Sequence, residues 1–323
     1  MHKVLITHEL PGEMVRGLTD KSEVTVWMGP GLLDASALQE ELQGCTGVVC
    51  LLTDRITGKL LDACPTLKFI SSMSVGVDHI DIAAATERGI PVGNTPGVLA
   101  ETTADATFAL LLAAARRTAE ADVFVRGGHW RPEVAWSPDF FVGKDVSGAT
   151  LGILGLGEVG CAVARRAQGF NMRVLGWNRS EKEVENVTAV SLEKLFEESD
   201  FLCVTVALTD DTRNLVNRER LALMKDDAVV VNTARGGIVD EEALVDALTQ
   251  NQLGAAALDV FAREPLPADH PLILLPNVVL APHIGSATRE TRKKMADMAA
   301  VNALAALDDA PMPACVNPEV YKR

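Results

Sequence analysis

Three ionisable side chains in the second half of the chain have the types and spacing for acid–base chemistry on a carbonyl compound. Arg235 lies in VNTARGG, Glu264 in DVFAREP and His283 in APHIGS. A forked guanidinium can hold a carboxylate and polarise a neighbouring carbonyl. Histidine can donate a proton near neutral pH, and a carboxylate on its other ring nitrogen fixes the tautomer. Each residue alone has a structural explanation, but together they favour reduction of an anionic carbonyl compound.

A glycine-rich turn, GILGLGEVG at residues 152–160, is the second chemical feature. Its glycines have G-x-G-x-x-G spacing between an expected strand and an expected helix, the context that indicates dinucleotide binding. Backbone N–H groups at the helix start would bind a pyrophosphate. We expect Glu158 to point to solvent, because a carboxylate repels phosphate. The candidate cofactor residues here are Gly155, Leu156, Gly157, Glu158, Val159 and Gly160.

The segment about 20 residues further on, Asn178-Arg179-Ser180, lacks the acidic residue that usually binds the ribose of NAD. Arg179, with two hydrogen-bonding neighbours, can instead hold a 2′-phosphate, and the missing carboxylate removes a repulsion. The alternative is an exposed loop arginine. We therefore predict NADPH as the preferred cofactor, with NADH possible.

The elements that must position these groups alternate between strands and helices, which predicts parallel sheets. Expected strands lie at 4–7, 24–27, 48–52, 67–73 and 91–94, then at 151–154, 173–177, 201–206, 228–233, 255–259 and 278–281. Between the two sets, the Ala/Leu-rich segment 101–117 predicts a helix buried between two bodies. Other expected helices include 36–42, 81–88, 159–168, 192–197, 218–224, 241–249 and 287–307. The fold class is α/β, with two doubly wound parallel sheets.

Composition narrows the possible partners. The 323 residues carry 30 Lys and Arg against 44 Asp and Glu, a net charge of −14. This acidic surplus argues against nucleic acids and anionic membranes as partners. The six cysteines show no metal-ligand spacing, so we expect no metal site and reduced thiols. With no signal-peptide pattern or long apolar segment, we expect a soluble, cytoplasmic protein.

Five stretches along the whole chain resemble the D-2-hydroxyacid dehydrogenase family, and most closely its glyoxylate/hydroxypyruvate reductase branch. They are SVGVDHID (74–81), GILGLGEVG (152–160), NTARGGIVDEEAL (232–244), ALDVFAREPLP (257–267) and PHIGSATRETR (282–292). The resemblance implies that Arg235 orients the substrate, that His283 is the general acid and base, and that Glu264 is its partner. His79 lies inside the first of these stretches, and we see no chemistry that requires it.

The resemblance also implies further site residues. Val75 and Gly76 would contact the substrate carboxylate, Ser286 would lie near the substrate, and Trp136 would reach across a dimer interface. Arg235 and His283 would contact the substrate too. The remaining cofactor contacts would come from Thr103, Thr233, Ala234, Asp259 and Gly285.

The same resemblance implies a Rossmann-type cofactor domain, residues 100–286, inserted into a flavodoxin-like substrate domain, residues 1–99 and 287–323. The implied reactions are glyoxylate to glycolate and hydroxypyruvate to D-glycerate, in a homodimer. Reduction of 2-ketogluconate or another 2-keto acid is an open alternative, because the Arg/Glu/His set would be identical. Phosphoglycerate dehydrogenase and formate dehydrogenase fit less well. A nucleotide-sensing corepressor is the alternative from another class, but this chain lacks the extensions of such proteins.

Overall fold

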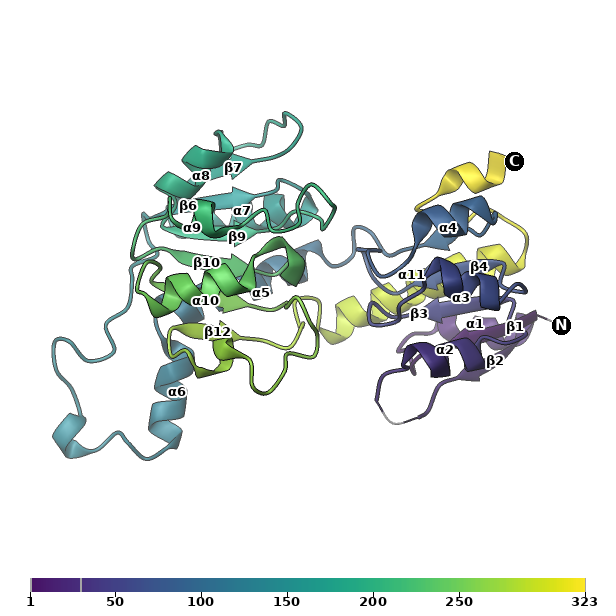
Figure 1. Cartoon of the computed structure of the whole chain (residues 1–323), viewed down its shortest axis with the longest axis horizontal. Helices are drawn as coiled ribbons and strands as arrows, with labels where there is room; N and C mark the ends of the chain where they lie inside the picture. Colours follow the sequence, from purple (N-terminus) through teal and green to yellow (C-terminus); the bar gives the residue numbers. More distant parts are fainter. Residues whose placement is uncertain (1, 30, 323) are drawn as a thin grey trace. The chain divides into compact units, whose positions relative to one another are not determined.

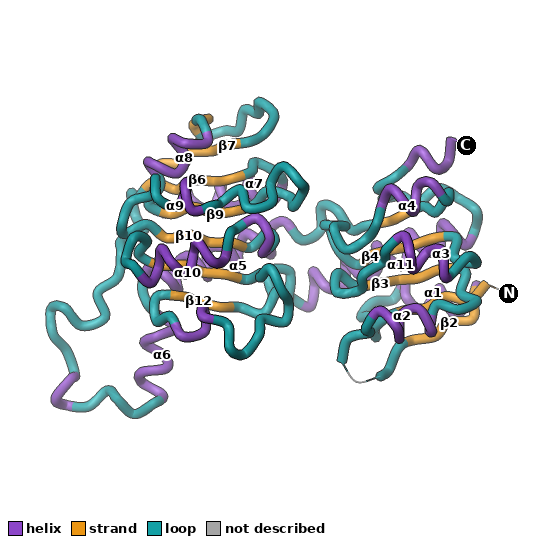
Figure 2. The backbone as a smooth tube through the Cα atoms, viewed as in Figure 1, coloured by secondary structure: helices purple, strands orange, loops and turns teal. Residues whose placement is uncertain are grey.

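The structure, a computed structural model, describes residues 2–29 and 31–322. The chain forms two compact units, one of Met1–Leu99 with Ala287–Arg323 and one of Ala100–Ser286 (Figure 1). We call them the terminal unit and the central unit. Each contains one sheet (Figure 2). The strands of both sheets all pair in parallel.

The terminal unit is a five-stranded sheet in the order β2-β1-β3-β4-β5, the flavodoxin-like order. Helices α1 and α11 pack on one face, and α2, α3 and α4 on the other. The strands are β1 His2–Ile6, β2 Ser22–Val26, β3 Gly47–Cys50, β4 Phe69–Ser72 and β5 Val92–Gly93. The helices are α1 Met14–Lys21, α2 Ala35–Glu41, α3 Gly58–Ala63, α4 Ile82–Glu87, α11 Arg289–Leu307 and the 3-10 helix η4 Pro318–Lys322.

The central unit has a seven-stranded sheet in the order β12-β11-β10-β9-β6-β7-β8, a Rossmann order extended by one strand. Helices α5 and α7 cover one face, and α8, α9 and α10 the other. The strands are β6 Thr150–Leu154, β7 Arg173–Trp177, β8 Thr188–Ala189, β9 Phe201–Val204, β10 Val229–Asn232, β11 Ala255–Leu258 and β12 Val278–Leu280. The helices are α5 Ala100–Ala115, α6 Thr118–Arg126, α7 Glu158–Gln168, α8 Leu192–Glu198, α9 Arg218–Leu221, α10 Glu241–Thr249 and the 3-10 helices η1 Pro132–Val134, η2 Gly236–Ile238 and η3 Pro271–Leu274.

The predicted fold class is confirmed, with two differences in the central unit. The seventh strand, β8, is two exposed residues at the sheet edge, too short for a hydrophobic pattern to reveal. The segment 101–117, expected to form a helix buried between two bodies, forms α5, but Asp105 and Ala109 of this helix are exposed. Its buried face packs on α7 and on β10 and β11.

Candidate active site

The turn after β10 presents Arg235. The backbone there is extended, with φ −149° and ψ 143°. The buried Asn232 side chain accepts a hydrogen bond from Ala234 N at 3.1 Å and donates one to the Arg235 carbonyl at 2.9 Å. The guanidinium Nη1 donates to the Ala234 carbonyl at 2.8 Å. A buried amide therefore fixes the backbone from which the guanidinium extends.

Gly236 brings this turn against the turn that follows β11. A Cβ atom at Gly236 would lie 1.8 Å from the carbonyl carbon of Phe261, so only glycine permits this backbone approach. The approach places Arg235 near enough to Glu264 for its charge to act on the Glu264 carboxyl. The glycine after the arginine in the ARGG motif is thus part of the site's construction.

Glu264 and His283 form a close pair. The imidazole Nδ1 lies 2.6 Å from Glu264 Oε2, and the other carboxylate oxygen, Oε1, accepts a hydrogen bond from Phe261 N at 2.9 Å. With a carboxylate at Nδ1, that nitrogen carries a proton, so Nε2 is left to exchange a proton with a ligand. Both side chains are partly exposed, His283 at 23% and Glu264 at 28%.

The electrostatics of Glu264 favour its ionised form. Burial raises the pKa of the carboxyl, but the hydrogen bond and charge of His283, the Phe261 N–H and the Arg235 guanidinium outweigh it. The pKa of Glu264 therefore lies below its ordinary value. The pair holds a carboxylate where it can stabilise an imidazolium.

Asp259, at the end of β11, holds the turn that carries His283. Its backbone carbonyl accepts from His283 N at 2.9 Å, and its two carboxylate oxygens each accept at 2.7 Å from Ile284 N and Gly285 N. His283 has φ +55°, a left-handed conformation that a non-glycine residue needs support to keep. Burial raises the pKa of Asp259. Its predicted contact with a cofactor stays a prediction, and the structure adds a positioning contact that sequence reasoning missed.

Predicted cofactor residues from three segments converge beside this turn. A Cβ atom at Gly285 would lie 3.4 Å from Thr103 Cγ2 on α5. One turn along α5, Thr107 Oγ1 lies 2.7 Å from Thr233 Oγ1, in the turn after β10. Thr103 and Thr233 are largely buried. The structure thus groups Thr103, Thr233 and Gly285 around the ends of β10 and β12.

The glycine turn has the geometry that a dinucleotide requires. Gly155 has φ +106°, and a Cβ atom at Gly160 would lie 2.0 Å from the Gly155 carbonyl oxygen. Among the described residues, no side chain caps the start of α7, and the space around Gly157 is open within 4 Å. Glu158 is exposed, as expected, in the first turn of α7, where a negative charge stabilises the helix dipole. The residues present fit a bound pyrophosphate.

The loop after β7 is tied to the glycine turn. Asn178 Oδ1 accepts a hydrogen bond from Leu156 N at 3.2 Å, and its Nδ2 donates to the Ser180 carbonyl at 2.9 Å. Lys182, which sequence reasoning missed, donates from Nζ to the Leu156 carbonyl at 2.6 Å. The structure therefore brings Asn178 and Ser180 to the glycine turn and adds a cation to this group.

Arg179 extends from the same loop into solvent. Its side chain is 73% exposed, and Nη1 lies 3.4 Å from Asp211 Oδ2. Exposed ion pairs of this kind contribute little to stability. The guanidinium is therefore accessible to a stronger anionic partner.

The remaining predicted substrate residues lie in separate places. Val75 and Gly76 belong to the terminal unit, in the turn after β4. Ser286 is the last residue of the central unit and follows the His283 turn. Trp136 is 80% exposed, on the segment that follows η1. The structure does not group Trp136 with the Arg235–Glu264–His283 set.

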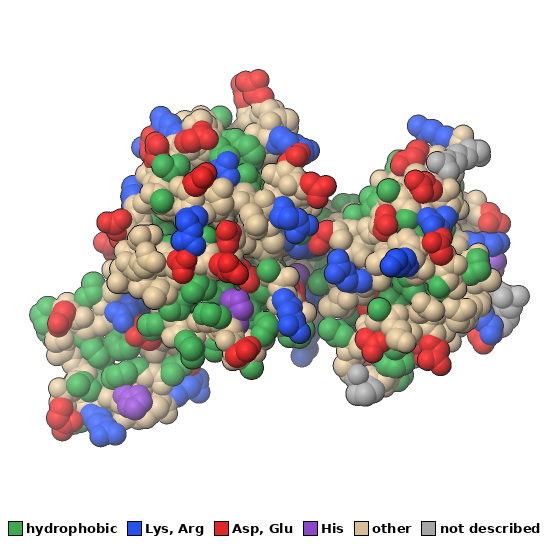
Figure 3. All heavy atoms as spheres, viewed as in Figure 1, with side chains coloured by type: hydrophobic (Ala, Val, Ile, Leu, Met, Phe, Trp, Pro, Cys, Tyr) green, Lys and Arg blue, Asp and Glu red, His purple; other side chains and the backbone are tan. Residues whose placement is uncertain are grey.

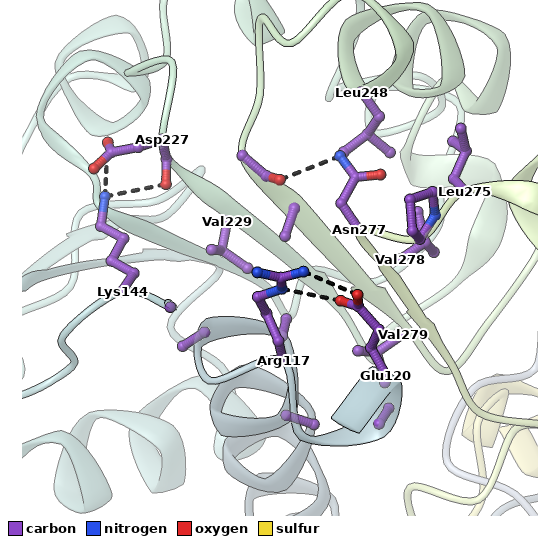
Figure 4. A pocket seen from close by; sticks show the side chains of 18 of the residues that line it. Arg117, Glu120, Lys144, Asp227, Val229, Leu248, Leu275, Asn277, Val278 and Val279 are labelled. Carbon is purple, nitrogen blue, oxygen red and sulfur yellow. Dashed lines mark hydrogen bonds and ion pairs between the residues drawn. The ribbon is translucent and has the colours of Figure 1, made fainter. Parts of the chain in front are cut away.

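A cavity of about 540 Å³ lies at the amino ends of strands of the central sheet, opposite the ends that carry Arg235, Glu264 and His283 (Figure 4). Its lining includes the first residues of β10, β11 and β12. Its charged groups pair with each other, Arg117 with Glu120 at 2.9 Å and Lys144 with Asp227 at 2.7 Å. Ligands of doubly wound sheets bind beyond the carboxyl ends of the strands, so we do not assign the active site to this cavity.

Comparison with known proteins identifies the family. The profile of the D-isomer specific 2-hydroxyacid dehydrogenase NAD binding domain matches residues 108–285. The chain belongs to this family. A glyoxylate reductase from Korarchaeum cryptofilum is 47% identical to it, over 99% of this chain and 97% of its own.

Two solved structures show how far this 2-hydroxyacid dehydrogenase shares its fold with relatives. The TT0316 protein from Thermus thermophilus has a TM-score of 0.90 and 46% identity, covering 97% of this chain and 99% of its own. An NADPH-dependent glyoxylate/hydroxypyruvate reductase from Sinorhizobium meliloti, in complex with NADP and malonate, has a TM-score of 0.85 and 31% identity, covering 98% and 97%. The predicted family is confirmed, and this 2-hydroxyacid dehydrogenase is an oxidoreductase with a nicotinamide-cofactor domain.

Two further features concern metal ions and membranes. Within residues 2–29 and 31–322, no three His, Cys, Asp or Glu side chains are grouped so that they could hold a metal ion. Among the helices of the same residues, none is both long and apolar enough to cross a membrane.

Proposed function

We propose that this dehydrogenase reduces small 2-keto acids, converting glyoxylate to glycolate and hydroxypyruvate to D-glycerate, with NADPH preferred over NADH. The observation that carries the proposal is the 2.6 Å pair between His283 Nδ1 and Glu264 Oε2, beside Arg235 at the carboxyl edge of the dinucleotide fold. A glyoxylate reductase 47% identical over nearly the whole chain supports the substrate class.

Each member of this set has one role in the proposed reaction. A bound nicotinamide supplies the hydride. Arg235 binds the substrate carboxylate and polarises the carbonyl. His283 holds a proton at Nε2 and gives it to the carbonyl oxygen as the alkoxide forms, and Glu264 stabilises the imidazolium and fixes its tautomer. The backbone N–H groups of Val75 and Gly76 provide a second carboxylate contact, which makes the terminal unit the substrate domain.

The NADPH preference rests on Arg179 and on the absence of an acidic residue at the end of β7. A 2′-phosphate dianion can replace the weak, exposed partner Asp211, because charge-assisted contacts to phosphate are stronger. Arg179→Ala should raise the KM for NADPH by about tenfold and leave the KM for NADH within about twofold. Equal kcat/KM values for the two cofactors in the wild-type enzyme would contradict the preference.

We also propose a homodimer formed through the segment around α6, residues 118–143. No residue of α6 is buried in the single chain, and the segment projects from its unit (Figures 1 and 3). Val123, Val125 and Trp136 are 70%, 51% and 80% exposed, more apolar surface than a segment in water normally shows. A second copy would cover this segment and would place Trp136 toward the partner's site.

The dimer is tested by sedimentation velocity. The wild-type chain should sediment as a dimer, and Val123→Asp with Val125→Asp should shift it to monomer. Trp136→Ala should lower kcat/KM without dissociating the dimer. The matched control is Trp130→Ala, a second exposed tryptophan whose Nε1 donates to the Ala135 carbonyl within its own segment. A monomeric wild-type chain would contradict the proposal.

The cysteines support a reducing compartment. All six are free thiols, and Cys45, Cys50, Cys64 and Cys203 are buried. Burial raises the pKa of the Cys203 thiol to about 12, which keeps it protonated and unreactive. On this basis we propose that the enzyme works in the cytoplasm.

The deciding experiment for the function is an NADPH-oxidation assay with glyoxylate, hydroxypyruvate, pyruvate and 2-ketogluconate, repeated with NADH. We expect the highest kcat/KM with glyoxylate and hydroxypyruvate. A clear preference for 2-ketogluconate would place the enzyme among reductases of bulkier keto acids. Absence of turnover with all four acids would contradict the proposed function.

A further inference from the structure

In the turn after β4, three consecutive peptide carbonyls are each held by one donor of the terminal unit. The Ser74 carbonyl accepts from Thr95 N at 2.8 Å. The Val75 carbonyl accepts from Asn94 Nδ2 at 2.9 Å, and the Gly76 carbonyl accepts from Ser74 Oγ at 2.8 Å. The orientation of three successive peptide planes is therefore fixed.

The N–H groups of the same planes point the opposite way. In a trans peptide the N–H lies antiparallel to the C=O, and the only cis bond among residues 2–29 and 31–322 is Glu264–Pro265. Holding the three carbonyls therefore turns the N–H groups of Val75, Gly76 and Val77 to the other side. Within those same residues, none of these N–H groups has a hydrogen-bond acceptor. Successive unpaired N–H groups form a concave site for an anion.

The hydrogen bond that holds the Gly76 carbonyl is the last in a chain of hydrogen bonds that begins at His79. Ser74 Oγ uses its one hydrogen on Gly76, so in its 2.7 Å contact with Ser72 Oγ it must accept. Ser72 then has no hydrogen left for its 3.0 Å contact with His79 Nε2. The imidazole must therefore donate, and the chain of hydrogen bonds runs from His79 through Ser72 and Ser74 to Gly76.

Because the side chains of this hydrogen-bond chain are buried, a change in its direction is energetically costly. Ser72, Ser74 and His79 are 0%, 3% and 9% exposed, so water cannot replace a missing donor. In such surroundings a broken chain leaves buried polar groups unpaired, and each unpaired group is costly. Without the His79 donor, the Ser72 hydroxyl is no longer oriented toward Ser74. A Ser74 hydroxyl that no longer accepts from Ser72 can rotate away, which releases the Gly76 carbonyl and the peptide plane that carries the Val77 N–H.

We propose that His79 is a positioning residue for the substrate carboxylate. Its Nε2–H sets the direction of the hydrogen bonds through Ser72 and Ser74. These hold the Gly76 carbonyl toward Ser74 Oγ, so that the N–H groups of the turn face the opposite side, where an anion can bind. The inference rests on the proposed function for the identity of that anion, a 2-keto acid carboxylate. His79 touches neither substrate nor cofactor in this proposal, so its removal should affect binding of the keto acid selectively.

The kinetic test compares three variants of the full-length enzyme. His79→Leu removes the donor and should raise the KM for glyoxylate by about tenfold, with the KM for NADPH unchanged within about twofold. His79→Gln restores an N–H at the position of Nε2 and should recover most of that loss. The matched control is Ser71→Ala, which removes a buried hydroxyl of the same strand that donates to the Ala299 carbonyl at 2.7 Å, outside the chain of hydrogen bonds.

The outcomes separate positioning from packing. An unchanged KM in His79→Leu, or an equal rise in Ser71→Ala, would overturn the proposal. Failure of His79→Gln to recover affinity would overturn it as well. If His79→Leu does not fold, Ser74→Ala takes its place, since it removes the donor to Gly76 at the end of the chain and should raise the KM for glyoxylate in the same way.

A readout without activity completes the test. In the wild-type protein labelled with ¹⁵N-histidine, the His79 signal, assigned by its loss in His79→Gln, should show a protonated Nε2. An unprotonated Nε2 would overturn the hydrogen-bond chain, whatever the enzyme reduces. Absence of keto acid turnover in the wild type, with Nε2 protonated, would instead contradict the proposed function alone.

Discussion

The two units carry their candidate site groups after strands of a parallel sheet, but they use different parts of the chain. In the central unit the groups are side chains, Arg235 after β10, Glu264 after β11 and His283 after β12. In the terminal unit they are backbone N–H groups after β4, oriented by buried side chains. We expect substitutions in the central unit to affect the chemical step, and substitutions in the terminal unit to affect substrate binding alone.

Among the substitutions that test this comparison, His283→Asn should have the largest effect. Asparagine tolerates the left-handed backbone of His283, so the turn can persist while the imidazole is lost. General acid catalysis contributes about 10²- to 10⁴-fold, so kcat with glyoxylate should fall within that range while KM changes little. Steady-state kinetics measure both values, and an unchanged melting temperature shows that the fold is intact. Retention of kcat within about tenfold would break the comparison, because the central unit would then supply no acid.

Arg235→Ala should have the next largest effect, on binding and rate together. It removes the forked donor that holds the carboxylate and polarises the carbonyl, so kcat/KM should fall at least tenfold, on the order of the loss of a charged hydrogen bond. Arg235→Lys keeps the charge without the fork and should lie between alanine and wild type. Arg16→Ala, at an exposed arginine on α1, controls for loss of charge alone. Unchanged kinetics in Arg235→Ala would remove its proposed role.

The sequence pointed to both sets of candidate residues, but it did not point to the side chains that orient the backbone N–H groups. Arg, Glu and His at strand ends have chemistry of their own, and the structure brings these three residues together in one unit. The importance of His79 depends instead on contacts with Ser72, Ser74 and Gly76, and the directions of hydroxyl hydrogens are not encoded in residue spacing. The hydrogen bonds from Ile284 N and Gly285 N to the Asp259 carboxylate were also not predicted, because they join residues about 25 positions apart in the sequence.

In the fold, too, local patterns were predicted from the sequence and long-range contacts were not. Apolar runs of four or five residues predicted the central strands of both sheets, because such runs fit strands buried on both faces. β8 has only Thr188 and Ala189, both exposed, and its place is set by pairing with β7. Lys182, in the loop between β7 and β8, was not predicted for a related reason, since only the tertiary fold brings it to the Leu156 carbonyl. Short edge elements and long-range polar contacts are the parts that pattern alone cannot supply.

Glu264→Gln tests the electrostatics of the central unit and should have a moderate effect at neutral pH. The pKa of Glu264 is lowered in the folded protein, so its stabilising pair with His283 is complete above the ordinary value of about 4.3 and is lost only as pH falls through the lower, folded value. Wild-type kcat/KM should therefore persist on the acidic side below that ordinary value. Glutamine does not titrate, so the variant should lose several-fold in kcat/KM at neutral pH and show no acidic limb from this residue. Identical acidic limbs in both enzymes, with circular dichroism confirming folding at each pH, would leave Glu264 a structural residue.

Asn94→Ala should have the smallest effect and is the finest test of the terminal unit. The variant loses the 2.9 Å hydrogen bond to the Val75 carbonyl but keeps the backbone carbonyl that accepts from Asn302 Nδ2. One neutral hydrogen bond is worth about 1 kcal/mol, so the KM for glyoxylate should rise about fivefold with kcat unchanged.

The double variant with His79→Leu then decides whether the turn acts as one unit. Asn94 and the His79 chain hold neighbouring peptide planes, so their effects on KM should be less than additive. Additive effects would mean that the two planes bind the carboxylate independently, and a fall in kcat would show that the terminal unit contributes to the chemical step as well.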